Sequence, residues 1–131
     1  MSDSVRWPYG DAPTAPTDER DVAAVAVRAL VDARHDGDEL VITGPDSLTQ
    51  REQVAILGDA IGRPLRFEEL TPDEARRELP FPPAALEMLM KAWSAAIGQP
   101  ALVTDVIEQV TGRRARSFAE WARDHAADFT S

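Results

Sequence analysis

The sequence predicts an α/β fold in which helices dominate and one βαβ unit contributes a small parallel sheet, packed by several helices. Three observations support this prediction. Capping-box patterns open helices at three places, two short strand-like runs flank one of these helices, and 10 prolines mark the joints between elements. A length of 131 residues allows a single domain with one core. We therefore expect an extended segment over residues 1–17 and one domain over residues 18–131.

The N-terminal segment predicts little regular structure. Three prolines and Gly10 fall within residues 1–17, so the segment can form at most a short strand at Val5–Trp7, followed by an extended loop.

Residues 18–34 predict a helix that is apolar nearly all round. Acidic residues at its start suit the positive end of the helix dipole, and His35 suits its C-terminal end. A surface helix carries one apolar stripe, whereas a helix that is apolar on every side is buried on several. Either this helix is central to the domain, or it also packs against a second chain. The residues assigned to that interface are Val22, Val25, Ala26, Ala29 and Leu30.

A βαβ unit is expected next. Residues 39–43 predict a strand, a capping box at Thr49 and Glu52 opens a helix, and residues 65–70 predict a second strand. At this spacing the two strands are expected to be parallel and joined by a right-handed crossover.

The remainder of the chain is predicted to be helical. A capping box at Thr71 opens a short helix that ends before Pro80, and residues 83–97 form a longer one with a clear apolar stripe. Thr104 is expected to cap another short helix. A third capping box, at Ser117, opens the terminal helix.

Composition excludes several classes of function. The 23 acidic residues outnumber the 14 basic ones, and the net charge of −9 argues against binding to nucleic acid or to an anionic membrane surface. The sequence has no cysteine, and its two histidines lie on different predicted helices, so no metal site is expected. We find neither a signal peptide nor an apolar run long enough to span a membrane, and we expect a cytoplasmic protein.

Few residues offer catalytic chemistry. The sequence contains no HExxH, GxSxG or P-loop motif. Should the protein be an enzyme, its acid and base groups would be Tyr9, Asp11, Asp18 and His125. Structural roles compete with this hypothesis, because Asp18 suits a helix start and His125 suits a solvated helix face.

Large apolar side chains form a second group of candidates. Trp7 and Tyr9 lie in the Pro- and Gly-rich segment, where a role in the core is less expected. Met90 and Trp93 share one helix stripe, a position that fits the core equally well. Adaptable apolar side chains beside loops make good pocket walls, so we expect these four residues to bind a small molecule.

Five segments occur in order between Val5 and Phe129: R-W-P-Y-G-D-A, D-E-R-D-V-A-A-V-A-V-R-A-L, V-I-T-G-P-D-S-L-T-Q-R-E-Q-V, I-G-R-P-L-R-F-E-E-L and S-F-A-E-W-A-R-D-H. In this combination the chain resembles the C-terminal, substrate-side part of NmrA-like proteins. These are atypical relatives of the short-chain dehydrogenases/reductases that bind NAD(P), and they include sugar-epimerase-like and azoreductase-like members.

The resemblance also implies an absence. The family's Gly-rich GxxGxxG turn, which holds the dinucleotide, does not occur in this sequence. Its Tyr-x-x-x-Lys pair is missing too, since the only tyrosine is Tyr9 and the only lysine is Lys91. We therefore expect no cofactor in this chain. In the relatives the helix equivalent to residues 18–34 would pack on the Rossmann sheet, so here a homodimer or a partner chain would cover residues 22–31.

These inferences lead to three functional hypotheses. The favoured one is a free-standing protein that binds a small apolar or aromatic molecule and has no nicotinamide redox activity. Should it be an enzyme, its reaction would be a cofactor-independent cyclisation, isomerisation or dehydration in bacterial biosynthesis. The second is a non-catalytic interaction module, or one half of a split NAD(P)-dependent reductase. The third is a fragment that folds without an independent role.

Overall fold

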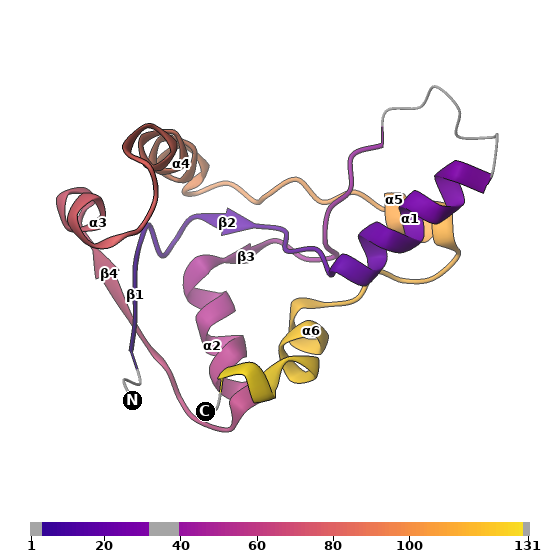
Figure 1. The fold of residues 1–131 in the computed structure, drawn as a ribbon. Helices are drawn as coiled ribbons and strands as arrows, with labels where there is room; N and C mark the ends of the chain where they lie inside the picture. The colour runs from indigo at the N-terminus through magenta and orange to yellow at the C-terminus, as the bar shows by residue number, and fades with distance from the viewer. Residues whose placement is uncertain (1–3, 32–39, 130–131) are drawn as a thin grey trace.

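The protein is described by a computed structural model that covers residues 4–31 and 40–129. Figure 1 shows α3 and α4 at one side of the molecule, α1 and α5 at the other, and α2 and α6 between and below them. The α/β class with dominant helices is confirmed. None of the helices in the described part of the chain is both long and apolar enough to cross a membrane.

A parallel sheet of two strands lies at one side of the molecule. Strand β1 (Ser4–Pro8) pairs with β4 (Arg66–Leu70), in a register that sets Trp7 opposite Glu69. The sequence predicts both strands and a parallel sheet, but it assigns the wrong partner to β4, because β1 takes the place expected for residues 39–43.

The predicted strand at residues 39–43 is therefore wrong over its described part, residues 40–43, while Glu39 lies outside the described residues. Residues 40–43 form hydrogen bonds with Thr104 instead of pairing with a strand. The carbonyl oxygen of Val41 accepts a hydrogen bond from the Thr104 hydroxyl at 2.6 Å, and the Thr43 hydroxyl accepts one from the Thr104 N–H at 2.8 Å. Contacts through two threonine side chains hold the segment extended without a strand ladder.

A short antiparallel pair connects the turn after β1 to helix α2 (Gln50–Ile61). Strands β2 (Pro13–Thr14) and β3 (Leu48–Thr49) form this pair. The predicted capping box is present at the start of α2: the Thr49 hydroxyl accepts from the Glu52 N–H, and the Glu52 carboxylate accepts from the Thr49 N–H. Gly62, with φ of 73°, ends the helix in the left-handed conformation that favours glycine.

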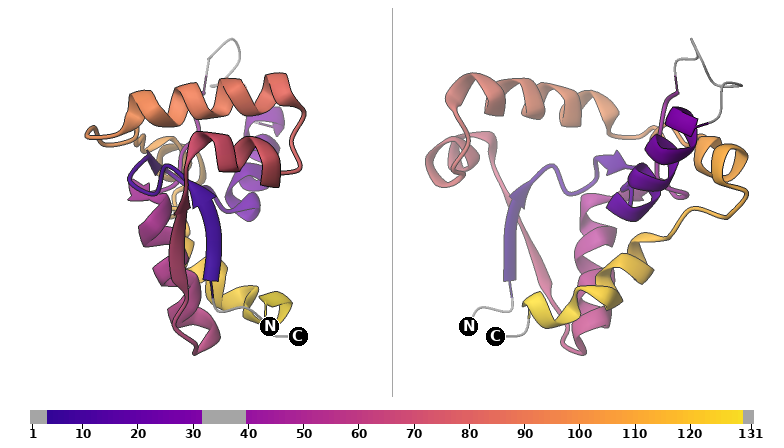
Figure 2. Two further views of the ribbon diagram at one scale, coloured as in Figure 1. Left: turned by 90° about the vertical axis from the view of Figure 1, so that its left-hand side faces the viewer. Right: turned by 45° about the vertical axis from the view of Figure 1, so that its right-hand side comes forward.

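Helices α3 (Pro72–Glu78) and α4 (Pro83–Ala96) lie side by side at one end of the molecule (Figure 2). The capping box at Thr71 opens α3 as predicted. Leu70, which ends β4, is buried in a cluster with Ala75 of α3 and with Leu86 and Met90 of α4.

At the opposite end, α1 (Glu19–Val31) packs against α5 (Val106–Thr111). Val25 is buried against Ile107 and Val110, in a second hydrophobic cluster. The prediction that Thr104 caps this helix is wrong, because α5 begins after Asp105 and has no side-chain cap. The Thr104 hydroxyl is used by Val41 instead.

The expectation that the first helix is central and buried on several sides is wrong for the described chain. Only one side of α1 is covered; Val27 is 59% exposed and Leu30 is 87% exposed. The predicted last turn, residues 32–34, and the flanking His35 and Gly37 lie outside the described residues.

The chain closes with α6 (Phe118–Asp124) and the short 3₁₀-helix η2 (Ala126–Phe129), which pack along α2. The predicted capping box at Ser117 and Glu120 is present. The buried apolar side chains thus include two separate clusters, one at each end, and further residues outside them, such as Val54 of α2 and Ala122 of α6.

Candidate functional site

Aromatic side chains gather where β1 meets α4. The ring centroids of Trp7 and Trp93 are 5.7 Å apart, those of Tyr9 and Trp93 are 6.4 Å apart, and Phe81 meets Trp7 edge-on at 6.0 Å. Met90 is buried in the adjacent cluster, against which Tyr9 and Trp93 pack. The structure thus brings the four predicted pocket residues into one region, and their role in binding a ligand stays a prediction.

Tyr9 adopts a backbone conformation that is rare for a large side chain. Its φ of 55° is the only positive value among the described residues other than glycine. Gln50 holds this turn: its amide nitrogen donates to the carbonyl oxygens of Pro8 at 3.1 Å and Tyr9 at 2.8 Å, and its amide oxygen accepts from the Trp7 indole at 2.6 Å. Such strain persists only where neighbouring contacts enforce it, and it concentrates at functional sites.

Tyr9 and Met90 also line an open hollow of about 350 Å³ between the turn after β1 and the helices α3 and α4. Its other walls include Arg76, Glu87 and Lys91. Arg76 binds both carboxylate oxygens of Glu87, at 2.5 and 3.2 Å, and this pairing holds the pKa of Glu87 below its ordinary value. Glu87 is therefore ionised and occupied near neutral pH.

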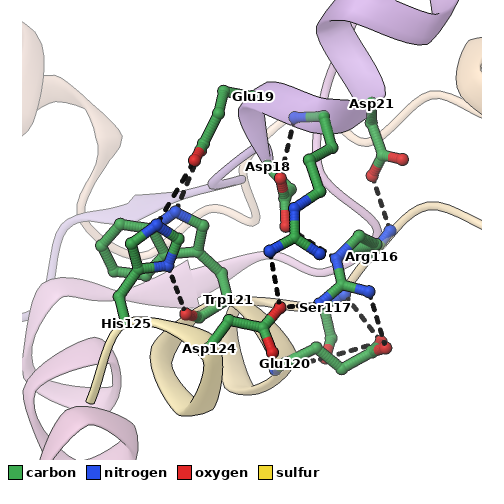
Figure 3. Close-up of polar contacts among 10 residues, drawn as sticks. Asp18, Glu19, Asp21, Arg116, Ser117, Glu120, Trp121, Asp124 and His125 are labelled. Carbon is green, nitrogen blue, oxygen red and sulfur yellow. Dashed lines mark hydrogen bonds and ion pairs between the residues drawn. The ribbon is translucent and has the colours of Figure 1, made fainter. Parts of the chain in front are cut away.

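A second polar region joins the start of α1 to α6 (Figure 3). The guanidinium of Arg116 donates to the Asp18 carboxylate at 2.8 Å and also binds Asp124, and the Arg116 backbone N–H donates to Asp21 at 2.7 Å. The Asp18 side chain is only 1% exposed. Segments almost a hundred residues apart are thereby joined through one arginine.

The carboxyl group of Asp18 is stabilised in its charged form. Burial by itself raises its pKa, but hydrogen bonds from the Arg20 backbone N–H and the Arg116 guanidinium outweigh burial and hold the pKa below its ordinary value. Every contact of this carboxylate is thus accounted for by a structural role.

His125 and Trp121 extend the same region. Their rings stack at 4.5 Å, and Glu19 accepts from the Trp121 indole at 3.0 Å and lies 3.5 Å from His125 Nε2. His125 Nδ1 lies 2.9 Å from the Trp121 carbonyl oxygen, close enough to donate to it in the tautomer that carries its proton on Nδ1. A hollow of about 190 Å³ opens beside Trp121 and Asp18.

The four candidate acid and base residues fall in two different regions. Asp18 and His125 belong to the α1–α6 junction in Figure 3. Tyr9 and Asp11 belong to the turn after β1, where the exposed Asp11 carboxylate lies 3.4 Å from Arg51 Nε. No described contact joins the two pairs, and the catalytic roles stay predictions.

The residues that organise the two regions were not singled out by the sequence. Gln50 and Arg116 each act on partners far along the chain, Gln50 on Trp7 and Arg116 on Asp18, and Phe81 meets Trp7 across a similar gap. The one local signal is that Gln50 directly follows the cap residue of α2, where a side chain can reach the preceding turn.

The exposed face of α1 forms a third candidate surface. Of the predicted interface residues, Val25 is buried on α5, whereas Val22 and Leu30 are exposed. Val27 and Val31 enlarge this apolar face, which we call the α1 face and define as Val22, Ala26, Val27, Leu30 and Val31.

Comparison with known proteins shows which proteins the chain is similar to. No family model matches the sequence. It is 47% identical, over 95% of its length, to a (4-alkanoyl-5-oxo-2,5-dihydrofuran-3-yl)methyl phosphate reductase of Streptomyces griseus, and 37% identical, over 93%, to an NAD(P)H azoreductase of Xenophilus azovorans. The chain spans 45% and 44% of these two relatives.

Solved structures agree on the fold. A nucleoside-diphosphate-sugar epimerase of Staphylococcus aureus superposes with a TM-score of 0.77 at 16% identity, over 92% of this chain and 43% of that one. An NADPH-dependent quinone oxidoreductase of Escherichia coli gives 0.74 at 20% identity, over 92% and 46%. These findings confirm the resemblance to NmrA-like proteins. The match to less than half of each relative is consistent with a C-terminal portion of such a protein.

Gly58 and Gly62 are not placed as the glycines of a dinucleotide-binding turn. A turn that holds pyrophosphate opens a helix, whereas Gly58 lies within α2 and Gly62 ends it. A Cβ at Gly58 would come within 3.0 Å of the Arg63 carbonyl oxygen and the Leu65 nitrogen, so Gly58 serves the return of the chain toward β4. Across residues 4–31 and 40–129, no three histidine or carboxylate side chains gather closely enough to hold a metal ion.

Proposed function

We propose that this chain is the substrate-side part of an NAD(P)H-dependent reductase, and that it works with a nucleotide-binding half that its 131 residues do not contain. That half is a further stretch of the same polypeptide or a separate chain. The observation that carries the proposal is the α1 face, which is apolar and exposed on a helix whose opposite side is already fixed by α5. Contiguous exposed apolar surface is typical of an interface.

The names of the relatives favour reduction over the other reactions. Both relatives described above are reductases, and this chain matches less than half of each. A cofactor-independent cyclase, isomerase or dehydratase would need acid and base groups in one place. The candidates in this chain are divided between the turn after β1 and the α1–α6 junction. We therefore prefer the split-reductase hypothesis.

The substrate in this proposal is a small, largely apolar or aromatic molecule in the cytoplasm. It lies against Tyr9 and Met90; the Tyr9 ring packs beside Trp93, and Trp93 packs against Trp7. Flat aromatic rings offer large contact area at a small cost in side-chain entropy. The enforced conformation of Tyr9 keeps its ring in place before a ligand arrives.

The test is reconstitution of NADPH-dependent reduction. The part of the S. griseus reductase that this chain does not match is co-expressed with this chain, and in a second format is fused to it in the order of the intact relative. We expect NADPH to be consumed with that reductase's own substrate by the pair or the fusion, and neither binding nor consumption of NADPH by this chain alone. A fusion that binds NADPH but never reduces substrate, or NADPH binding by the isolated chain, would overturn the proposal.

A further inference from the structure

The hollow beside Tyr9 contains one cation without an ionic partner in the described chain. Lys91 of α4 lines this hollow, and no carboxylate of residues 4–31 or 40–129 forms an ion pair with it. It is also the only lysine of the sequence, in a chain whose net charge is −9. The ammonium of this exposed side chain is therefore available to a ligand that enters the hollow.

The neighbouring carboxylate is already engaged, which keeps it from pairing with Lys91. Glu87 lies one turn earlier on the same helix, at the spacing that favours a Glu–Lys pair. Arg76 of α3, however, binds both oxygens of Glu87 and is itself held by Asp73 at 2.7 Å. Among the residues that line the hollow, Arg76 and Glu87 balance each other's charge, and Lys91 is the cation that no ion pair with a described residue engages.

Other donors share the same hollow. Tyr9 and Ser94, which also line it, carry hydroxyl groups, and Met90 adds an apolar wall. An ammonium with two hydroxyls is a donor set suited to an oxyanion, since a lysine acts as a point charge toward phosphate or carboxylate oxygens. The apolar and aromatic surface lies immediately beside these donors.

We propose that this hollow is an anion subsite, in which Lys91 binds the phosphate or carboxylate group of a substrate whose apolar body lies against Tyr9 and Met90. The inference deepens the proposed function by giving the substrate a charged end, and it rests on that function only for the statement that the ligand is a substrate. Lys91 is thus a specificity residue, which selects anionic molecules over neutral ones of the same shape.

The test is a titration of the chain followed by NMR with three probes that share one ring: phenyl phosphate, benzoate and benzyl alcohol. We expect at least one anionic probe to bind more tightly than benzyl alcohol and to shift the resonances of Tyr9 and Lys91. The Lys91→Gln variant should weaken binding of that probe about tenfold, as expected for loss of one charge-assisted contact. The affinity of the Lys91→Gln variant for benzyl alcohol should equal that of the wild type.

The matched control is Arg113→Gln. It removes the same charge from an exposed arginine that forms no ion pair with the described residues, so anion binding should be unchanged. Binding of phenyl phosphate without benzoate assigns a phosphate ester, and the reverse assigns a carboxylate. The proposal of an anion subsite is overturned by any of three results. These are equal affinity for all three probes, no binding at millimolar concentration, and unchanged anion affinity in Lys91→Gln. If the anion subsite fails one of these tests but the reconstituted reductase still reduces its substrate, the proposed function remains supported.

Discussion

At the scale of single residues, Gln50 makes three side-chain hydrogen bonds to the end of β1 and the turn after it. Its one amide group contacts Trp7, Pro8 and Tyr9 and so holds a tyrosine at positive φ. Few other side chains could do the same, because the site requires an acceptor and two donors in one planar group.

Replacing Gln50 should therefore destabilise the turn. Gln50→Leu leaves the Trp7 indole N–H and two carbonyl oxygens without their partners, and we expect a loss of about 1–3 kcal/mol in the free energy of unfolding. Denaturant unfolding followed by tryptophan fluorescence measures it. Gln109→Leu, at an exposed position of α5, is the control and should change stability little. Equal stability of the two variants would contradict the role given to Gln50.

Asp18 predicts a dependence of stability on pH. The pKa of its carboxyl group is lower in the folded chain than the value of about 3.9 in unfolded peptides. The stabilisation is therefore complete above that unfolded pKa and is lost as the pH falls through the folded one. Asp18→Asn should cost about 2 kcal/mol near neutral pH, since it leaves the Arg116 guanidinium without its buried partner.

The measurement is urea unfolding of both proteins over a series of pH values. The difference between wild type and Asp18→Asn should shrink as the pH falls below the unfolded pKa of about 3.9, and it should be lost below the lower folded pKa, where both side chains are neutral. Asp128→Asn, at an exposed position of η2, is the control and should remain close to wild type throughout. A difference that stays constant down to the lowest pH would contradict the ionic role of Asp18.

The sequence could predict which side chains belong to the candidate site but not how they are held. Trp7, Tyr9, Met90 and Trp93 stand out because residue type alone makes them pocket or core material, and the structure brings them together. The network of Figure 3 could not be foreseen, because Asp18 and Arg116 meet across 98 positions of sequence. No periodicity reports a contact over that distance.

At the scale of elements, the difference between local and distant interactions decides what the sequence reveals. The capping boxes of α2, α3 and α6 involve residues three apart, and all of them are present where expected. The strand at residues 39–43 failed because a strand exists only with a partner, and the partner of β4 turned out to be β1. Composition marks a segment as extended without stating which neighbour it pairs with.

Helix α1 packs on one side only, and substitutions of two valines on different sides of the helix test this. Val25→Ala removes two buried methyl groups from the cluster with Ile107 and should cost about 1–2 kcal/mol. Val27→Ala, on the α1 face, should be neutral or slightly stabilising, because alanine has the higher helix propensity. Thermal unfolding of the two variants checks this. Similar losses for both would mean that the α1 face is already covered in the isolated chain.

At the scale of the whole molecule, the two hydrophobic clusters explain why a chain with 44% hydrophobic residues still exposes so many of them. The clusters lie on opposite sides of the molecule, one at α3 and α4 and the other at α1 and α5 (Figure 1), and the α1 face belongs to the second side. In the proposed function, that surface is the contact with a nucleotide-binding half. Because Leu30 is 87% exposed within it, a charged side chain at this position should cost the isolated chain little and the contact much.

Sedimentation velocity of the chain, alone and co-expressed with the unmatched part of the S. griseus reductase, tests this contact without relying on catalysis. We expect a one-to-one complex that Leu30→Glu abolishes without lowering the thermal stability of the chain alone. Leu102→Glu, an exposed leucine outside the α1 face, is the control and should leave the complex intact. A stable homodimer through the α1 face, or a chain that stays monomeric beside a folded nucleotide-binding half, would contradict the proposed pairing.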